Sequence, residues 1–160
     1  MYLTEKFAAF IETTSFEDLP AQVVYQAKER IMDTLGAAAA GSENWEYCEN
    51  LKSACRKLGR GEYHVIGDDK NEFSPAVTAM INSAFAHSIE LDDGHKNAGC
   101  HVGAVVVPAA LALGEALGAN GRDVITAVVI GYEITYRIAS HVNPAQINSG
   151  FHPSCNCGVF

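Results

Sequence analysis

Residues 85–104 read FAHSIELDDGHKNAGCHVGA and connect two strongly apolar segments of the chain. This stretch combines acidic residues, histidines and turn-forming glycines, which are Glu90, Asp92, Asp93, His87, His95, His101, Gly94, Gly99 and Gly103. Titratable side chains at the mouth of an apolar helical core are a common setting for chemistry. A solvated loop that joins two helices is the alternative interpretation, and from this stretch alone both remain open.

Apolar residues at helical spacing predict a helix on each side of this stretch. Residues 74–89 begin with Ser-Pro, a typical helix start, and residues 105–117 are apolar nearly all round, as in a central helix. Pro108 lies in the first turn of the second helix or kinks it. A further helix is expected over residues 123–141, ending at Asn143-Pro144 because a residue before proline disfavours the helical conformation.

The part of the chain before this stretch also reads as helical. We expect helices over residues 4–13, 18–41 and 44–58, and the alanines at 37–40 would permit close approach of a second helix. The only plausible strand covers residues 62–66, and one short strand does not build a sheet. The predicted fold class is therefore all-α, a multi-helix domain with at most one short strand near residues 62–66.

Bulk composition limits the range of partners. A chain of 160 residues with 48% hydrophobic and 19% charged residues is long enough for one globular core. Its net charge of -8 and scattered basic residues argue against binding to nucleic acids or anionic membranes. Its longest apolar run, residues 102–113, is shorter than the roughly 20 residues that a membrane span needs. We expect no nucleic-acid partner and no membrane association.

The cysteines and the two ends of the chain indicate its setting. Five cysteines, an odd number, and an N-terminus without a secretion signal predict a cytoplasmic protein. Residues 149–160 form a glycine-containing loop that leads into the apolar start of a helix. So short a helix is not stable alone, and we therefore expect the chain to be the N-terminal part of a longer protein.

Three kinds of chemistry compete for these residues. A metal site could draw on His95, Cys100, His101, His152, Cys155 and Cys157, but their spacing matches no usual zinc pattern. A cysteine nucleophile could be Cys100 beside His101, or Cys155 near His152, although buried inert thiols fit these positions better.

General acid-base catalysis by histidine is the third possibility. His101 and His152 each lie in a glycine-containing loop ahead of an apolar helix. Imidazole titrates near neutral pH, so it can take a proton from a carbon next to a carboxylate, or return one, without a cofactor. The alternative is that both histidines are helix caps or satisfied core residues.

Several segments together resemble the MmgE/PrpD family. They are AHSIELDDGH at 86–95, HVG at 101–103, VPAALAL at 107–113, GFHPSCNCGVF at 150–160 and RIMDTLGAAAAG at 30–41. The resemblance covers essentially all 160 residues. It implies the N-terminal part, residues 1–160, of a large helical domain, with the lid domain and the C-terminal helices of the family absent from this sequence.

The resemblance also implies an activity and site residues. The family includes 2-methylcitrate dehydratase, cis-aconitate decarboxylase and iminodisuccinate epimerase, which are homodimers that act on small polycarboxylates without a cofactor or metal. By this resemblance the expected catalytic residues are His101, His152, Asp92 and Asp93, and the expected substrate-binding residues are Glu90, Gly94, His95 and Ser154.

The leading functional hypothesis is therefore the N-terminal part of a cofactor-independent lyase or isomerase. It would abstract a proton alpha to a carboxylate of a small polycarboxylate substrate. The alternative hypothesis is a truncated, non-catalytic helical module that forms a homodimer through its apolar helix faces.

Overall fold

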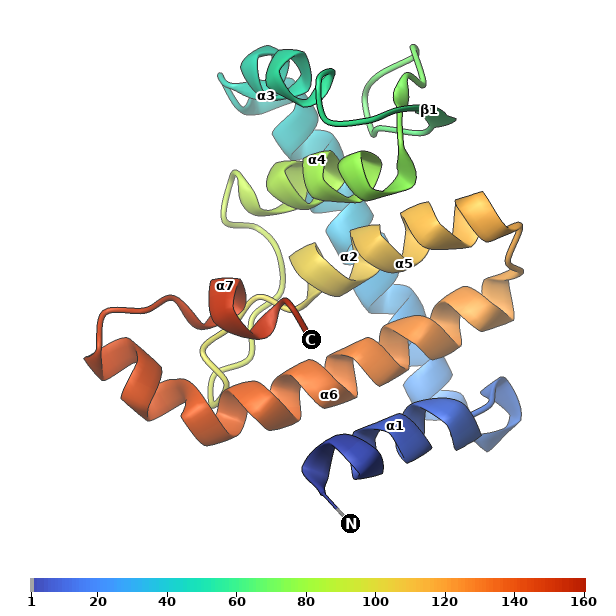
Figure 1. The fold of residues 1–160 in the computed structure, drawn as a ribbon, viewed down its shortest axis with the longest axis vertical. Coiled ribbons are helices and arrows are strands. Elements are labelled where there is room, and N and C mark those ends of the chain that lie inside the picture. Colours follow the sequence, from blue (N-terminus) through green and yellow to red (C-terminus); the bar gives the residue numbers. More distant parts are fainter. Residues whose placement is uncertain (1) are drawn as a thin grey trace.

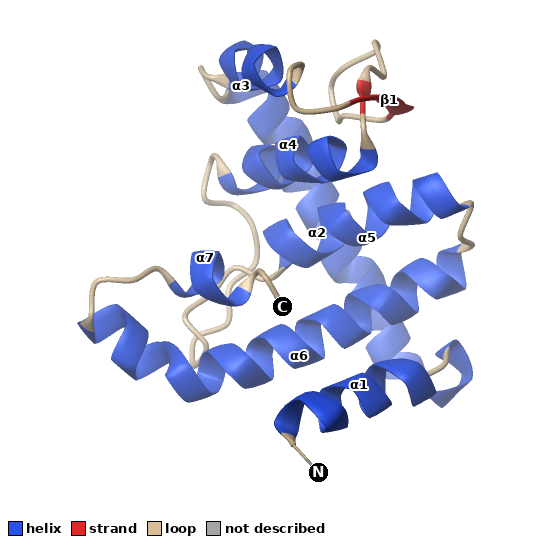
Figure 2. Cartoon of the chain, in the orientation of Figure 1, coloured by secondary structure: helices blue, strands red, loops and turns tan. Residues whose placement is uncertain are grey.

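The computed structural model describes residues 2–160 and shows seven α-helices and one strand among them. Figure 2 shows how little of this part of the chain is strand. The all-α prediction is confirmed, and the strand lies at Arg60–Tyr63, where it bridges to Phe73, slightly before the expected position. The helices are α1 (Leu3–Thr13), α2 (Ala21–Asn44), α3 (Cys48–Cys55), α4 (Pro75–His87), α5 (Gly103–Leu117), α6 (Gly121–Asn148) and α7 (Pro153–Cys157).

Helix α2 is the long element against which the others are arranged. In Figure 1 it runs behind α4, α5 and α6, which lie in successive tiers, while α1 lies next to α6 at the bottom of the view. Helix α2 packs against α4, α5 and α6, and α4 also packs against α5. The short α7 contacts α6 and lies beside the segment that joins α4 to α5. This arrangement brings the end of the chain next to residues 88–102.

The core depends on close contact between α2 and α4. Phe85 and Ile81 of α4 are 1% and 0% exposed, and Ala38 of α2 is 1% exposed. A Cβ atom added at Gly41 would lie 2.0 Å from the carbonyl oxygen of Phe85, so only glycine permits this approach. The small residues of α2 therefore permit the close approach of a second helix that the sequence predicted. Their packing holds the C-terminal end of α4 in place.

Two helix boundaries differ from the predictions. Helix α6 continues through Pro144 to Asn148 instead of ending at residue 143. The side chain of Asn143 is buried and donates a hydrogen bond to the Asn97 carbonyl at 2.8 Å, so tertiary contact outweighs the local preference against proline. Helix α1 begins at Leu3, one residue before the predicted start at residue 4, and Glu5 accepts a hydrogen bond from the Tyr2 N–H at that end.

Helix α3 is also shorter than the predicted range of residues 44–58. It covers Cys48–Cys55, because α2 extends through Asn44 and takes up the start of that range. Across residues 2–160, the structure contains no helix with the length and apolar character that crossing a bilayer requires.

Candidate active site

The segment between α4 and α5 folds into a compact turn that places His101 two residues before α5. His95 N–H donates to the Cys100 carbonyl at 3.0 Å, and Gly99 N–H donates to the His95 carbonyl at 2.7 Å. Gly99 has a φ of +61°, a conformation that glycine adopts without strain. This turn positions the side chain of His101 between the end of α4 and the start of α5.

The carboxylate of Asp92 lies between two imidazole rings. Its side chain is fully buried, and its Oδ2 atom lies 3.0 Å from His87 Nδ1 and 3.4 Å from His101 Nδ1. Since a carboxylate only accepts hydrogen bonds, the proton of His87 must be on Nδ1, the atom that faces Asp92. Asp92 therefore orients the imidazole of His87 and faces that of His101.

His152 joins this pair from the far end of the chain. It is the residue directly before α7, and its ring centroid lies 6.5 Å from that of His101 and 6.2 Å from that of His87. The backbone N–H of His101 donates a hydrogen bond to Ser154 Oγ at 2.8 Å, which connects the two loops directly. Two histidines about fifty residues apart in the sequence thus lie in one cluster of three imidazoles, which we call the histidine cluster: His87, His101 and His152.

Asp93 points to a different set of partners. Its Oδ1 accepts a hydrogen bond from the Gly103 N–H at 2.9 Å, at the start of α5, and its Oδ2 accepts one from the Tyr132 hydroxyl at 3.0 Å. A Cβ atom at Gly103 would lie 2.6 Å from Asp93 Oδ1, so glycine is required there. Burial, together with the nearby Asp93 charge, strongly raises the pKa of Tyr132. In this structure Asp93 connects the N-terminus of α5 to Tyr132 of α6, with one hydrogen bond to each.

The remaining expected substrate-binding residues are divided between these two environments. The Glu90 side chain is 71% exposed, and its Oε1 lies 3.7 Å from His87 Nε2. A Cβ atom at Gly94 would lie 3.9 Å from His101 Cε1, so Gly94 borders the histidine cluster. His95 instead packs on Tyr136, with ring centroids 4.3 Å apart, and its Nδ1 accepts the Ala98 N–H.

The cysteines do not provide a nucleophile in the turn. Cys100 is 1% exposed, and burial, with the neighbouring Cys157 and Asp93, raises its pKa to about 11. It is therefore a buried, protonated thiol at neutral pH, as inert core cysteines are. Cys155 is exposed, and its Sγ lies 4.0 Å from His152 Nδ1.

His87 is the member of the cluster that the predicted site residues did not include. Its position at the last turn of an amphipathic helix is also typical of an ordinary polar residue at a helix end. The available signal was its spacing, five residues before Asp92, across a break in the helix. The side chains of His87, Asp92 and His101 have ligand atoms within 4.8 Å of one another, whereas the metal ligands that the sequence analysis considered and disfavoured share only His101 with this group.

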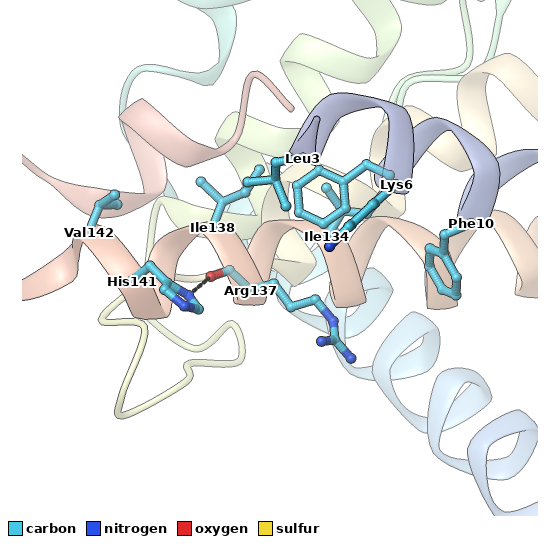
Figure 3. Close-up of a pocket in the computed structure, with 9 residues that line it drawn as sticks. Leu3, Lys6, Phe10, Ile134, Arg137, Ile138, His141 and Val142 are labelled. Atoms are coloured by element: carbon cyan, nitrogen blue, oxygen red, sulfur yellow. Dashed lines mark hydrogen bonds between the residues drawn. The ribbon is translucent and has the colours of Figure 1, made fainter. Parts of the chain in front are cut away.

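Two of the cavities outside the histidine cluster are lined in part by other histidines. One of about 440 Å³ is lined by Asp93, Gly94, His95, Tyr132 and Tyr136 together with Arg30 of α2. The other is an apolar groove of about 510 Å³ between α1 and α6, where His141 Nδ1 donates a hydrogen bond to the Arg137 carbonyl of its own helix (Figure 3). The histidine cluster itself lies at the surface, since the His87 and His101 side chains are 35% and 28% exposed.

The fold and the cluster together define a helical domain with a histidine-carboxylate site at one loop junction. The N-terminal domain of the MmgE/PrpD family matches residues 5–160, and the chain belongs to that family.

Several relatives carry a named activity. A cis-aconitate decarboxylase of Aspergillus terreus is 30% identical over 171 aligned positions, which cover 98% of this chain and 32% of that protein. Human cis-aconitate decarboxylase is 28% identical, with 98% of this chain and 34% of that protein covered. A cis-aconitate decarboxylase-like protein of Aspergillus oryzae is 27% identical, with 94% and 33% covered. The chain thus spans about a third of the length of these relatives.

Proposed function

We propose that residues 1–160 are the N-terminal part of a lyase that acts on a small polycarboxylate, with cis-aconitate as the first candidate substrate. The observation that carries the proposal is that the ring centroids of His101 and His152 lie 6.5 Å apart, with His101 next to the buried carboxylate of Asp92. The family and the named activity of the relatives support the same reaction class. The proposal covers the chemistry of the cluster, and it requires neither a cofactor nor a metal.

His101 and His152 are the proposed acid-base pair. His101 Nδ1 lies 3.4 Å from Asp92 Oδ2, and when the ring proton is on that nitrogen, the lone pair on Nε2 is free to accept a proton. Removal of a proton from the carbon next to a carboxylate leaves an enediolate and an imidazolium, and the second histidine can supply the proton that completes the reaction. In a decarboxylation, CO₂ leaves, the electron pair of the broken bond remains on the carbon skeleton, and an imidazolium protonates that carbon.

The roles of the other residues follow from their places around the pair. Asp92 is proposed to orient the histidines, and Ser154 to hold the His101 backbone against the loop of His152. Glu90 and Gly94 border the cluster and are the proposed substrate contacts. Asp93 and His95 belong to the neighbouring tyrosine environment, so we propose that they shape the loop that carries these contacts.

Turnover measurements test this assignment. In the full polypeptide that carries this chain, the rate of CO₂ release from cis-aconitate is compared for wild type, His101→Ala and His152→Ala. Loss of a positioned acid or base typically costs about 10²- to 10⁴-fold in rate, and we expect kcat to fall by at least about 100-fold in each variant. His141→Ala, at an exposed position on α6, is the matched control and should leave kcat unchanged. Equal rates in all four proteins would refute the assignment.

A non-catalytic, homodimeric module is the second candidate, and exposed apolar side chains on α2 favour it. Tyr25 and Met32 are 64% and 70% exposed and lie seven residues apart, hence on the same face of the helix. Met32 lines a groove together with Glu29, Arg30 and Asp33. Charges of both signs beside an apolar patch are self-complementary across a twofold axis, so a second copy of this chain fits this face.

Sedimentation equilibrium distinguishes the two candidates. The dimer proposal predicts a twofold mass that reverts to the monomer in Met32→Glu, with Met80→Glu on α4 as an exposed control. A dimer without any cis-aconitate turnover in the full polypeptide would favour the non-catalytic module, and a monomeric wild type would exclude it.

A further inference from the structure

We propose that His87, Asp92 and His101 form a binding site for a divalent transition-metal ion of the zinc class. The observation is that His87 Nδ1 and His101 Nδ1 both face one buried carboxylate oxygen, Asp92 Oδ2. The three ligand atoms lie within 4.8 Å of one another. This site goes beyond the proposed lyase function, which needs no metal.

The distances suit a small ion. With metal-ligand bonds of about 2.0–2.1 Å, two ligand atoms in a tetrahedral zinc site lie about 3.3 Å apart. The Asp92 Oδ2 atom lies 3.0 Å from His87 Nδ1 and 3.4 Å from His101 Nδ1. The ligand atoms of all three residues lie within 4.8 Å of one another, which is close to this spacing. Two imidazoles and one carboxylate, with an open fourth position for water, are an ordinary zinc ligand set.

The hydrogen bonding of the site also points to a ligand. His101 Nδ1 is buried and has no hydrogen-bond partner, although it lies next to a carboxylate. Unpaired buried nitrogen atoms are costly, and a metal ion would give His101 Nδ1 a partner. Glu90 lies 3.7 Å from His87 Nε2, where a carboxylate commonly supports a metal-bound histidine through its other ring nitrogen.

Metal binding would switch off the proposed chemistry. A metal ion on Nδ1 of His101 leaves the ring proton on Nε2. That nitrogen then donates a hydrogen bond and has no lone pair with which to accept a proton. Zinc is therefore expected to inhibit the lyase by removing its base. This consequence rests on the proposed function, whereas the binding site itself does not.

The nearest competing ligands are those of the neighbouring loop. Cys155 is exposed and its Sγ lies 4.0 Å from His152 Nδ1, so a thiolate-imidazole site there is the rival to be excluded. A cobalt(II) ion substituted for zinc distinguishes the two, since a thiolate ligand adds an intense charge-transfer band and nitrogen and oxygen ligands do not.

The test is titration of the untagged, reduced 160-residue chain with ZnCl₂ by calorimetry and with CoCl₂ by absorption. We expect one equivalent bound at low-micromolar Kd, a tetrahedral cobalt spectrum and no thiolate band. His87→Asn, His101→Asn and Asp92→Asn should each weaken binding by about tenfold or more. Cys155→Ser and His141→Asn are the controls and should bind as wild type does.

His87→Asn keeps the test decisive if the buried Asp92→Asn variant fails to fold, because the His87 side chain is 35% exposed. Circular dichroism verifies its fold. Absence of binding, a thiolate band, or unchanged affinity in His87→Asn would each overturn the metal site. These measurements do not use the lyase reaction, so they can fail while turnover of cis-aconitate succeeds, and the reverse.

Discussion

Two adjacent carboxylates, Asp92 and Asp93, have separate structural roles. Asp92 faces the imidazoles of His87 and His101, and Asp93 binds the Gly103 N–H and the Tyr132 hydroxyl. One carboxylate therefore orients the proposed acid-base groups, while the other fixes the helix that follows them. Substitutions at the two positions should consequently differ in kind, the first affecting chemistry and the second affecting stability.

Tyr132→Phe tests the anchoring role of Asp93. Removing the hydroxyl leaves an oxygen of the partly buried Asp93 carboxylate without its donor, which costs about 1–3 kcal/mol. Urea denaturation should show this decrease in the free energy of unfolding. Tyr25→Phe, at an exposed position on α2, is the matched control and should change it by less than about 0.5 kcal/mol. A Tyr132→Phe protein as stable as wild type would show that the hydrogen bond to Asp93 anchors nothing.

The cysteines should react with a thiol reagent at very different rates. Cys155 is exposed, whereas Cys48, Cys55, Cys100 and Cys157 are buried. Burial raises the pKa of Cys100 to about 11, so its thiolate is scarce at pH 8. Ellman's reagent should titrate one thiol quickly in the native chain and all five in denaturant. Loss of the fast phase in Cys155→Ser would confirm its source, and a fast phase that persists would contradict the burial pattern.

At the residue scale, the sequence indicated which side chains are candidates for the site but not which partners they contact. His101 and His152, which the sequence places in two separate loops, lie close together in the structure. His95 and Asp93 come from the same motif but face Tyr136 and Tyr132, aromatic residues some forty positions later in the chain. No local pattern encodes which side of a turn a side chain takes when that side is decided by a distant helix.

At the scale of single elements, α6 shows where tertiary contact outweighs local preference. The helix continues through Pro144, which removes the hydrogen bond that a backbone N–H would donate to the carbonyl four residues earlier. Asn143 stays buried and bonded to Asn97 through this turn. The helices with apolar stripes, α2 and α4, were predictable to within a few residues because their own side chains decide their packing.

Replacing Pro144 with alanine should stabilise the domain. The exposed position would gain a helical hydrogen bond and a better helix former, which is worth up to about 3 kcal/mol. Pro75→Ala is the matched control, because Pro75 occupies the first position of α4, where an N–H has no helical partner. Thermal unfolding should show a higher Tm for Pro144→Ala alone. A lower Tm would mean that the proline is required by the path of the helix.

At the scale of the whole molecule, the free energy of unfolding should depend on pH through one buried ion pair. Lys52 Nζ lies 3.1 Å from Asp68 Oδ2, and the two side chains are 10% and 8% exposed. Burial alone would raise the pKa of Asp68, but the Lys70 N–H and the Lys52 ammonium outweigh it and lower that pKa. A carboxyl with a lowered pKa in the folded state stabilises the fold above its unfolded pKa, near 3.8, and this stabilisation is lost as pH falls through the folded value.

Asp68→Asn tests this contribution directly. The variant should be less stable than wild type at pH 7, and the difference should shrink as the pH is lowered below about 4. Chemical denaturation at a series of pH values measures both. A difference that stays constant down to the most acidic condition would show that the carboxylate charge is not the source of the stability.

The arrangement of the helices in the whole domain explains one contact that the sequence could not predict. Helical spacing predicted the class of fold, and a resemblance between motifs predicted the family. Neither could show that α7 would lie beside the 88–102 segment, because that contact depends on how α6 carries the chain across the molecule (Figure 1). The histidine cluster is a product of this long-range arrangement.

The central claim, that His101 and His152 form one site for a polycarboxylate, is tested most directly by NMR of histidine-labelled protein. In the full polypeptide, cis-aconitate is added while the imidazole resonances are followed. The account predicts that the signals of His101 and His152 shift together and saturate with one Kd, while those of the surface residues His64 and His141 stay unchanged. Signals of His101 and His152 that do not move while the protein turns over cis-aconitate would contradict it.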